Sequence, residues 1–254
     1  MTASIARAQL PTSDVQFVTH DFCVLETARS GSTTLVQGTE AVRHRRYAPA
    51  SLFKIIVAWA AFERGVADPR TPFLCNDAPG GVRAELTLAQ AMFVSSNDYF
   101  RALAEVVGKA DLDTYAIRAG WLTQAAVDSW LPEGVSGIER GGTMRVTPQE
   151  VHDFTVALMN GKVGSTPKIR QALAQSLRRP PEGGGPEVYG KTGAWGGAAW
   201  MTGYGPSGTK GRKAVTVLVS YRIPNWRPAR DLAVKTFYQR LGLEPEINAD
   251  SRLR

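Results

Sequence analysis

The hydrophobic pattern divides this chain into strand-like ends and a helical middle. Near the amino end, apolar and β-branched residues at 16–27 and 33–37 flank a Ser/Gly turn, which predicts a hairpin. Near the carboxyl end, similar runs predict three more strands, at residues 188–192, 199–204 and 214–223. Because strands at both ends enclose a helical segment, we expect one antiparallel five-stranded sheet, built from residues 16–40 and 187–243.

Residues 50–180 predict an all-helical subdomain beside the sheet, so the expected fold class is α/β, of the α+β type. Thr147 can cap a helix, with Pro148 at the first helical position and Glu150 completing a capping box. The expected helices cover residues 51–65, 87–97, 98–107, 112–119, 147 onward and 228–241. Stretches rich in Pro, Gly and polar residues predict loops at 68–81, 127–143 and 180–185.

A chain of 254 residues, 43% hydrophobic and 21% charged, is typical of one globular domain. We place that domain at residues 16–243, after a loose leader at 1–15 and before a tail at 244–254. No apolar run suits a signal peptide or reaches transmembrane length, so no membrane association is expected. The localisation is left open: the sequence as printed predicts a cytoplasmic protein, and a protein that has lost an export signal would be periplasmic or secreted.

The net charge of +7 favours anionic partners by long-range attraction. Apart from residues 43–46 the basic residues are scattered and no aromatic residues alternate with them, so nucleic acid is not an expected partner. The three histidines lack metal-ligand spacing, and no metal site is expected. Cys23 is expected to be a buried thiol, while its pairing with Cys75 and the oligomeric state are left open.

Candidate chemistry begins with Ser51 and Lys54, one turn apart at the start of an apolar helix. A serine hydroxyl becomes nucleophilic when a base takes its proton, and a desolvated lysine amine can be that base. The alternative is a helix-capping serine with a lysine that extends to solvent. A second Ser-x-x-Lys, at Ser207 and Lys210, lies in a Gly/Pro-rich turn where nothing buries it.

Two further motifs favour the catalytic interpretation. Ser95-Ser96-Asn97 lies where two helical segments meet, and Lys191-Thr192-Gly193 lies on an expected strand. Ser-x-x-Lys, Ser-x-Asn and Lys-Thr-Gly in this order form the signature of penicillin-binding proteins and class A β-lactamases. Three short motifs on the expected helix, loop and strand are far less frequent by chance than any one of them.

The detail resembles class D β-lactamases, which belong to the same superfamily of penicillin-recognising serine hydrolases. The segment 47–55, with Phe53 before the lysine, is similar to that family's nucleophile segment. Residues 199–204 resemble the strand that follows Lys-Thr-Gly, Trp130-Leu131 resembles a pair in the active-site loop, and residues 227–230 resemble the segment with the carboxylate-binding arginine. The resemblance covers about residues 17–243 and implies the β-lactamase/transpeptidase fold.

The resemblance implies a role for each motif residue. Ser51 would attack the lactam carbonyl, with Lys54 as base, and the N–H groups of Ser51 and Ala194 would form the oxyanion hole. Ser95 would relay a proton to the leaving nitrogen, and Lys191 would keep the site positive. The expected substrate-binding residues are Asn97, Trp130, Thr192, Gly193 and Arg230, with Arg230 binding the carboxylate by a bidentate fork.

One residue departs from the class D pattern. In that family the second motif is Ser-x-Val, and its valine helps to dry a pocket where the lysine reacts with CO2 to give a carbamate, the base for acylation and deacylation. Asn97 replaces the valine here and is expected to solvate an ammonium, whereas Phe53 and Trp130 favour the carbamate. Glu133 is a weak candidate for a substitute deacylating base.

We therefore expect a serine β-lactamase that hydrolyses β-lactams through an acyl-serine, with no cofactor apart from a carbamate that Lys54 can carry. The expected partner is a small β-lactam or acyl-D-Ala-like molecule. The alternatives are a penicillin-binding or sensor-like domain that is acylated without turnover, and a D,D-peptidase, esterase or biosynthetic transacylase with the same fold.

Overall fold

The computed structural model describes residues 21–28, 31–132, 137–179, 186–208, 211–222 and 226–244. The leader expected at 1–15, the linker at 180–185 and Glu133 lie outside these ranges, as does the tail from residue 245 onward.

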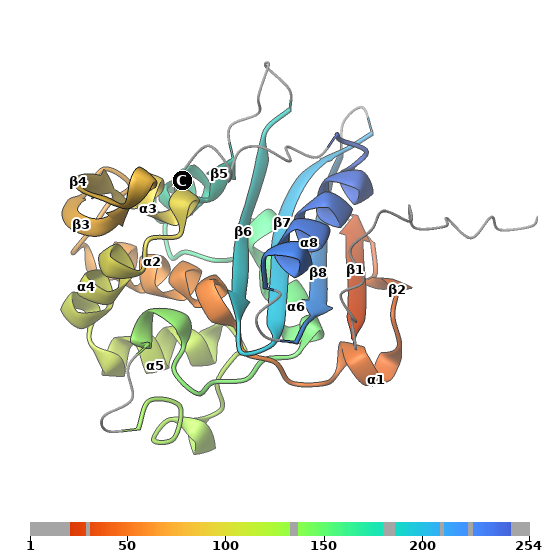
Figure 1. Ribbon diagram of the computed structural model, residues 1–254, viewed down its shortest axis with the longest axis horizontal. Helices are drawn as coiled ribbons and strands as arrows, with labels where there is room; N and C mark the ends of the chain where they lie inside the picture. Colours follow the sequence, from red (N-terminus) through yellow and green to blue (C-terminus); the bar gives the residue numbers. More distant parts are fainter. Residues whose placement is uncertain are drawn as a thin grey trace, which may run out of the picture.

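A central antiparallel sheet organises the molecule, in the order β2-β1-β8-β7-β6-β5 (Figure 1). Its strands are β1 (Phe22–Ala28), β2 (Thr34–Gln37), β5 (Arg178–Arg179), β6 (Val188–Trp195), β7 (Ala198–Ser207) and β8 (Gly211–Ser220). All five expected strands are present, which confirms the predicted fold class. The sixth, β5, escaped prediction because two arginines carry no strand pattern; they join the sheet only by pairing with the start of β6.

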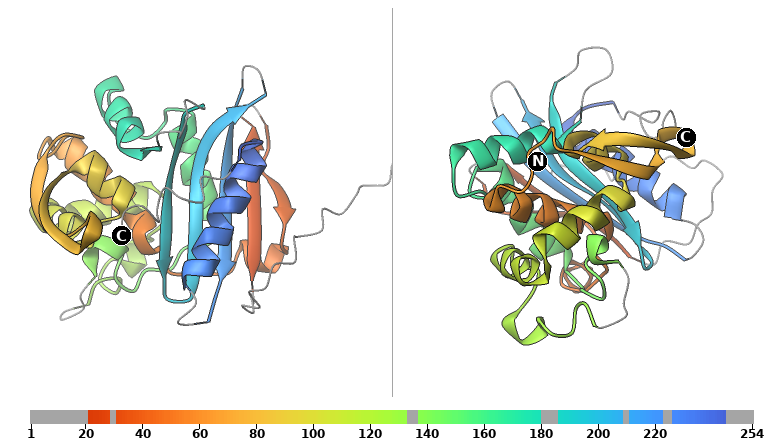
Figure 2. Two further views of the ribbon diagram at one scale, coloured as in Figure 1. Left: turned by 45° about the horizontal axis from the view of Figure 1, so that its top comes forward. Right: turned by 90° about the vertical axis from the view of Figure 1, so that its left-hand side faces the viewer.

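Helices cover both faces of the sheet, which explains why β8 is apolar on both sides. The helix α8 (Trp226–Leu241) packs on β7 and β8, and α6 (Pro148–Met159) packs on β8 and β7 as well. Figure 1 shows α8 running along the strands on the near face, with α6 behind them. The turned views in Figure 2 show the same layering, with α2 and the helices around it gathered to one side of the sheet.

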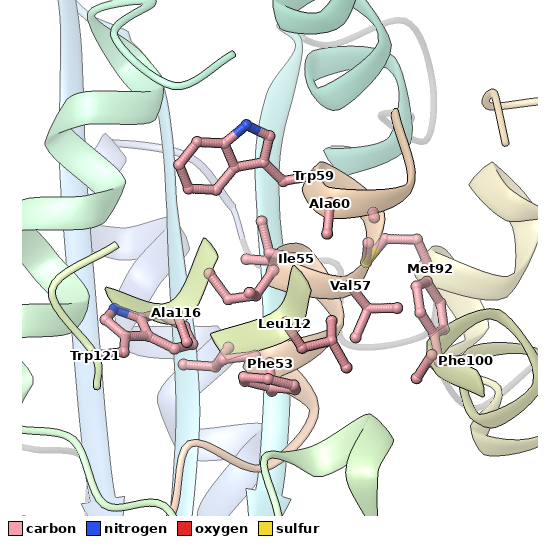
Figure 3. Packing of buried hydrophobic residues seen from close by; sticks show 14 of the residues in the cluster. Phe53, Ile55, Val57, Trp59, Ala60, Met92, Phe100, Leu112, Ala116 and Trp121 are labelled. Atoms are coloured by element: carbon pink, nitrogen blue, oxygen red, sulfur yellow. The ribbon is translucent and has the colours of Figure 1, made fainter. Parts of the chain in front are cut away.

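The helical region is built around α2 (Phe53–Arg64), whose residues are buried without a break from Phe53 to Phe62. A helix that is apolar on all sides belongs in a core. It contacts α4, α5 and α7, and Figure 3 shows its side chains within one cluster with Met92, Phe100 and Leu112. The surrounding helices are α3 (Leu88–Val94), α4 (Asn97–Val107), α5 (Lys109–Arg118) and α7 (Pro167–Leu177), whereas the short α1 (Glu40–Arg43) contacts β1 and α6.

Most helix boundaries follow local signals. Thr87 and Thr147 each cap a helix with a complete capping box, as their neighbouring residues predict. At the nucleophile segment the structure differs slightly: Ser51 lies in a 3-10 turn, Ala50–Leu52, that leads directly into α2. Ser51 and Lys54 are therefore still one helical turn apart, and Lys54 lies inside the apolar core.

The region expected to be all-helical also contains a hairpin, β3 (Pro72–Ala78) and β4 (Val82–Thr87), where a loop was expected at 68–81. The strand signal is weak because Pro72, Asn76 and Asp77 have low strand propensity. Tertiary contacts stabilise the hairpin instead: Asp98 of α4 accepts hydrogen bonds from the backbone and side chain of Asn76, at 3.0 and 3.1 Å. The hairpin in turn supports α4, which carries part of the candidate site.

Both cysteines are free and buried, as expected for Cys23, and burial raises the pKa of the Cys23 thiol to about 12. His152 is a core residue between the hydroxyls of Thr27 and Thr216, at 2.8 and 3.0 Å, and burial lowers its pKa to about 3. Within the described ranges no cluster of His, Cys, Asp and Glu could hold a metal ion. In the same ranges, no helix combines the length and apolar character needed to cross a membrane.

Candidate active site

A cavity of about 570 Å³ lies where the end of β6 meets the start of α2 and the start of α8, a volume suited to a small ligand. Most of the site residues inferred from the sequence line it: Ser51, Ser95, Asn97, Thr192, Gly193, Ala194 and Arg230. Lys54 and Lys191 lie beneath its surface and are 0% and 1% exposed. Trp130 does not line this cavity.

The backbone around Ser51 lies against β6 at a point where only glycine fits easily. A Cβ on Gly193 would lie 3.3 Å from the backbone nitrogens of Ser51 and Leu52. Beyond Tyr189, β6 pairs with β7 alone among the described strands, so its other edge faces the nucleophile segment. Ser51 and Ala194, whose N–H groups are the expected oxyanion hole, therefore line the same cavity.

Ser95 lies between the two buried lysines. The Lys54 Nζ donates to the Ser95 carbonyl at 2.6 Å and lies 3.3 Å from its Oγ, while the Lys191 Nζ donates to that Oγ at 2.9 Å. Ser95 has a left-handed backbone conformation with φ 62°, which residues other than glycine seldom adopt. Strain of this kind, also present at Ala50 with φ 54°, is typical of functional sites.

Burial gives Lys54 an unusual pKa. Removal of the ammonium from water is the main reason why its pKa falls from 10.5 to about 7, and the charges of Arg140 and Arg101 also act to lower it. The negative charges of Glu139 and Asp77 oppose this shift. Near neutral pH much of the lysine is therefore an amine, which can accept a proton.

Asn97 and Asp77 complete the surroundings of Lys54. The Asn97 Oδ1 accepts a hydrogen bond from the Lys54 Nζ at 2.8 Å. Asp77 accepts hydrogen bonds from the Ser96 hydroxyl at 2.5 Å and the Asn97 backbone N–H at 2.6 Å, and so holds the start of α4 in place. Sequence reasoning missed Asp77, because its role depends on the hairpin that the strand pattern did not reveal.

Trp130 packs behind the site and does not line the cavity, so its expected role in substrate binding stays a prediction. Its ring packs on Phe53 with centroids 5.4 Å apart, and only 2% of the residue is exposed. The indole N–H donates to Asp113 at 2.5 Å, and the Lys109 ammonium lies 5.5 Å from the ring centroid. Thus Trp130 and Phe53 form an apolar backing, while the polar atom of the indole is already engaged by α5.

Arg230 lines the cavity from α8, with 15% of its side chain exposed, and pairs with Asp231. A second arginine, Arg140, lines the cavity from the 3-10 turn η4 (Ile138–Arg140). Its neighbour Glu139 is fully buried, 3.2 Å from the Arg140 Nε and 3.8 Å from Arg101. No motif flagged this pair, since it lies in a segment whose composition predicted only a loop.

Comparison with solved structures shows the same fold in β-lactamases. A class D β-lactamase from Bacillus subtilis superposes with a TM-score of 0.69 at 19% identity, covering 89% of this chain and 92% of that one. The class D β-lactamase YbXI from Nostoc gives 0.70 at 16% identity, covering 89% and 95%. The class D β-lactamase OXA-427 gives 0.66 at 22% identity, covering 87% and 97%.

The fold is thus that of the penicillin-recognising serine hydrolases. Residues 23–222 match the family model of the penicillin binding protein transpeptidase domain, and the chain belongs to this family. No curated protein sequence gives a match.

Proposed function

We propose that this chain is a serine hydrolase of the β-lactamase type, acylated by β-lactams at Ser51. The observation that supports this most directly is the hydrogen-bonded chain from Lys54 through the Ser95 hydroxyl to Lys191, beneath a cavity that Ser51 lines. Such a chain can move a proton from the nucleophile to a leaving nitrogen. The test is intact-mass measurement after incubation with benzylpenicillin, with one added ligand mass expected.

In the proposed reaction the Ser51 Oγ attacks the lactam carbonyl carbon while the Lys54 amine takes the hydroxyl proton. The negative charge on the carbonyl oxygen is stabilised by the N–H groups of Ser51 and Ala194. When the carbonyl re-forms, the C–N bond of the lactam breaks, and the nitrogen receives a proton through Ser95. Lys191, buried at 1% exposure, keeps the potential around Ser95 positive.

Arg230 and Thr192 are the proposed carboxylate-binding residues. Truncation of one partner in a desolvated charge pair costs about 2–5 kcal/mol. We therefore expect Arg230→Ala to lower the acylation efficiency with benzylpenicillin by at least about 30-fold. The rate with a neutral ester should stay within about twofold, because that substrate has no carboxylate to lose. The measurement is the second-order rate constant for each substrate.

Arg227→Ala is the matched control for Arg230, because it removes the same charge from the same helix. Arg227 is exposed, stacks on Trp226 at 5.1 Å and does not line the cavity. We expect its acylation rates to match the wild type. An Arg230→Ala variant that still reacts with benzylpenicillin at near the wild-type rate would assign Arg230 a structural role.

Deacylation depends on the state of Lys54. Its Nζ donates to two carbonyl-type oxygens, those of Ser95 and Asn97, at 2.6 and 2.8 Å. A carbamate would bring its own oxygens against these acceptors, so the contacts suit an amine and do not fit that group. Two other features oppose this conclusion, because the low pKa of Lys54 and the apolar backing of Phe53 favour carbamate formation. Hydrolysis through a carbamate therefore stays a prediction that kinetics must test.

If Asn97 keeps Lys54 as an amine, the wild-type protein should open about one equivalent of β-lactam in a burst that forms the acyl-enzyme, followed by slow turnover that bicarbonate does not raise. This outcome favours the second candidate function, a penicillin-binding domain that is acylated with little turnover. In Asn97→Val one of the two acceptor oxygens is gone, so we expect faster turnover that rises with added bicarbonate. Rapid, bicarbonate-dependent hydrolysis by the wild type would instead establish the carbamate route.

A further inference from the structure

Among the described residues that line the active-site cavity, the charged ones are both arginines, Arg140 and Arg230. The buried Lys191 adds positive charge beneath it. A β-lactam with one carboxylate engages one arginine, and the proposed mechanism assigns that group to Arg230. The function of Arg140, which enters the cavity from another element, is left to be explained.

Arg140 is held in position on two sides. Its Nε faces the buried carboxylate of Glu139 at 3.2 Å, and its guanidinium carbon lies 4.2 Å from the ring centroid of Trp195, which is 51% exposed. A guanidinium carries five N–H donors in a rigid plane, and the contact with Glu139 uses the Nε edge. The terminal N–H groups are therefore the part that can meet a ligand in the cavity.

Arg140 shares its partner carboxylate with a second arginine. Glu139 lies 3.8 Å from Arg101 as well as 3.2 Å from Arg140, and Arg101 also lies 3.8 Å from Asp98. The buried Glu139 carboxylate has no hydrogen-bond partner among the described residues, so its attraction to the Arg140 guanidinium offsets part of the cost of burying the charge and holds the two groups together. The result is a preorganised cation, 23% exposed, at the cavity wall.

Arg140 and Arg230 belong to different walls of the cavity. The turn η4 packs on α2, α4 and the Ala50–Leu52 turn, whereas α8 packs on β6, β7 and β8. In the proposed pose the lactam carbonyl lies at Ser51 and Ala194, and the ring carboxylate is directed to Arg230. The acyl side chain extends from the other side of the carbonyl, and so toward the wall that carries Arg140.

We propose that Arg140, positioned by Glu139 and Trp195, is an anion-binding residue that selects substrates with a second negative group on the acyl side chain. The inference rests on the proposed function, since it takes the orientation of the ligand from acylation at Ser51. The substrate class is then a dianionic β-lactam or acyl-peptide analogue, with one carboxylate for each arginine.

The test compares benzylpenicillin with carbenicillin, which differs by one carboxylate on the benzyl carbon. Binding is measured by tryptophan fluorescence in Ser51→Ala, so that no covalent step contributes; Trp195 and Trp226 line the cavity and report on it. We expect carbenicillin to bind Ser51→Ala more tightly than benzylpenicillin does. Adding Arg140→Gln to Ser51→Ala should reduce this difference in affinity by about tenfold. Because Arg140 also affects Lys54, the ratio of the two dissociation constants is the readout.

Arg212→Gln serves as the control for loss of one positive charge, since Arg212 lies on β8 beside Tyr189 and Tyr204, away from the cavity lining. It should leave the ratio unchanged. An equal loss for both ligands in Arg140→Gln, or a wild-type ratio near one, would overturn the proposal. A failure of the proposed function is distinct: it appears as wild-type protein that gains no acyl mass, whatever the two dissociation constants show.

Discussion

Ser51→Ala is expected to abolish covalent labelling by benzylpenicillin, whereas the wild-type protein gains one acyl mass. The hydroxyl is the only group that this change removes from the cavity floor, at a position where the strained Ala50 and the close approach of Gly193 fix the backbone. Without the oxygen no ester can form, so the loss should be complete rather than partial. Intact-mass spectrometry reads the result, and peptide mapping assigns the modified residue.

Ser207→Ala is the matched control, because Ser207 begins the second Ser-x-x-Lys of the chain. Ser207 ends β7 and does not line the cavity, so its removal should leave the labelling intact. Retained labelling of Ser51→Ala, or an adduct that maps elsewhere in the wild type, would rule out Ser51 as the nucleophile.

Lys54→Met is expected to slow acylation by about 10²–10⁴-fold, the usual contribution of a positioned general base. Methionine keeps the length and apolar stem but cannot take the Ser51 proton. In the wild type the acylation rate should rise with pH through about 7, because the amine form of Lys54 accumulates above its lowered pKa. Stopped-flow measurement of benzylpenicillin acylation between about pH 5 and 9 checks both results.

Protein stability provides the control for Lys54→Met. In the wild type the pKa is about 7 when folded and 10.5 when exposed, so between these values only the unfolded chain binds the proton. The free energy of unfolding contributed by this group therefore rises with pH across that window and is lowest below 7. The free energy of unfolding of Lys54→Met should exceed that of the wild type by the largest amount near about pH 6 and by the smallest amount near about pH 10. The exposed Lys168→Met should show neither effect.

An unchanged acylation rate in Lys54→Met would transfer the role of base to another group. A flat pH profile between about pH 6 and 8 would contradict the lowered pKa. Either result leaves acylation at Ser51 standing, because the two experiments address different atoms.

Local signals in the sequence were sufficient for much of the fold. The capping boxes at Thr87 and Thr147 depend on hydrogen bonds that reach only three residues along the chain, so a short window contains all the information. The uninterrupted apolar run after Ser51 likewise predicts a core helix, because such a helix has no polar face to present to water. The hairpin at residues 72–87 did not follow, since contacts with α4 and not strand propensity stabilise it.

The three motifs by themselves indicated the chemistry of the candidate site, because the order and type of their residues carry that information. Only the tertiary structure placed the hydroxyl of Ser95 between Lys54 and Lys191, which are 41 and 96 residues away along the chain. Only folding turned the indole of Trp130 to Asp113 and brought Arg140 beside Trp195. Such contacts depend on how distant elements pack, and the lowered pKa of Lys54 arises from that same packing through loss of water.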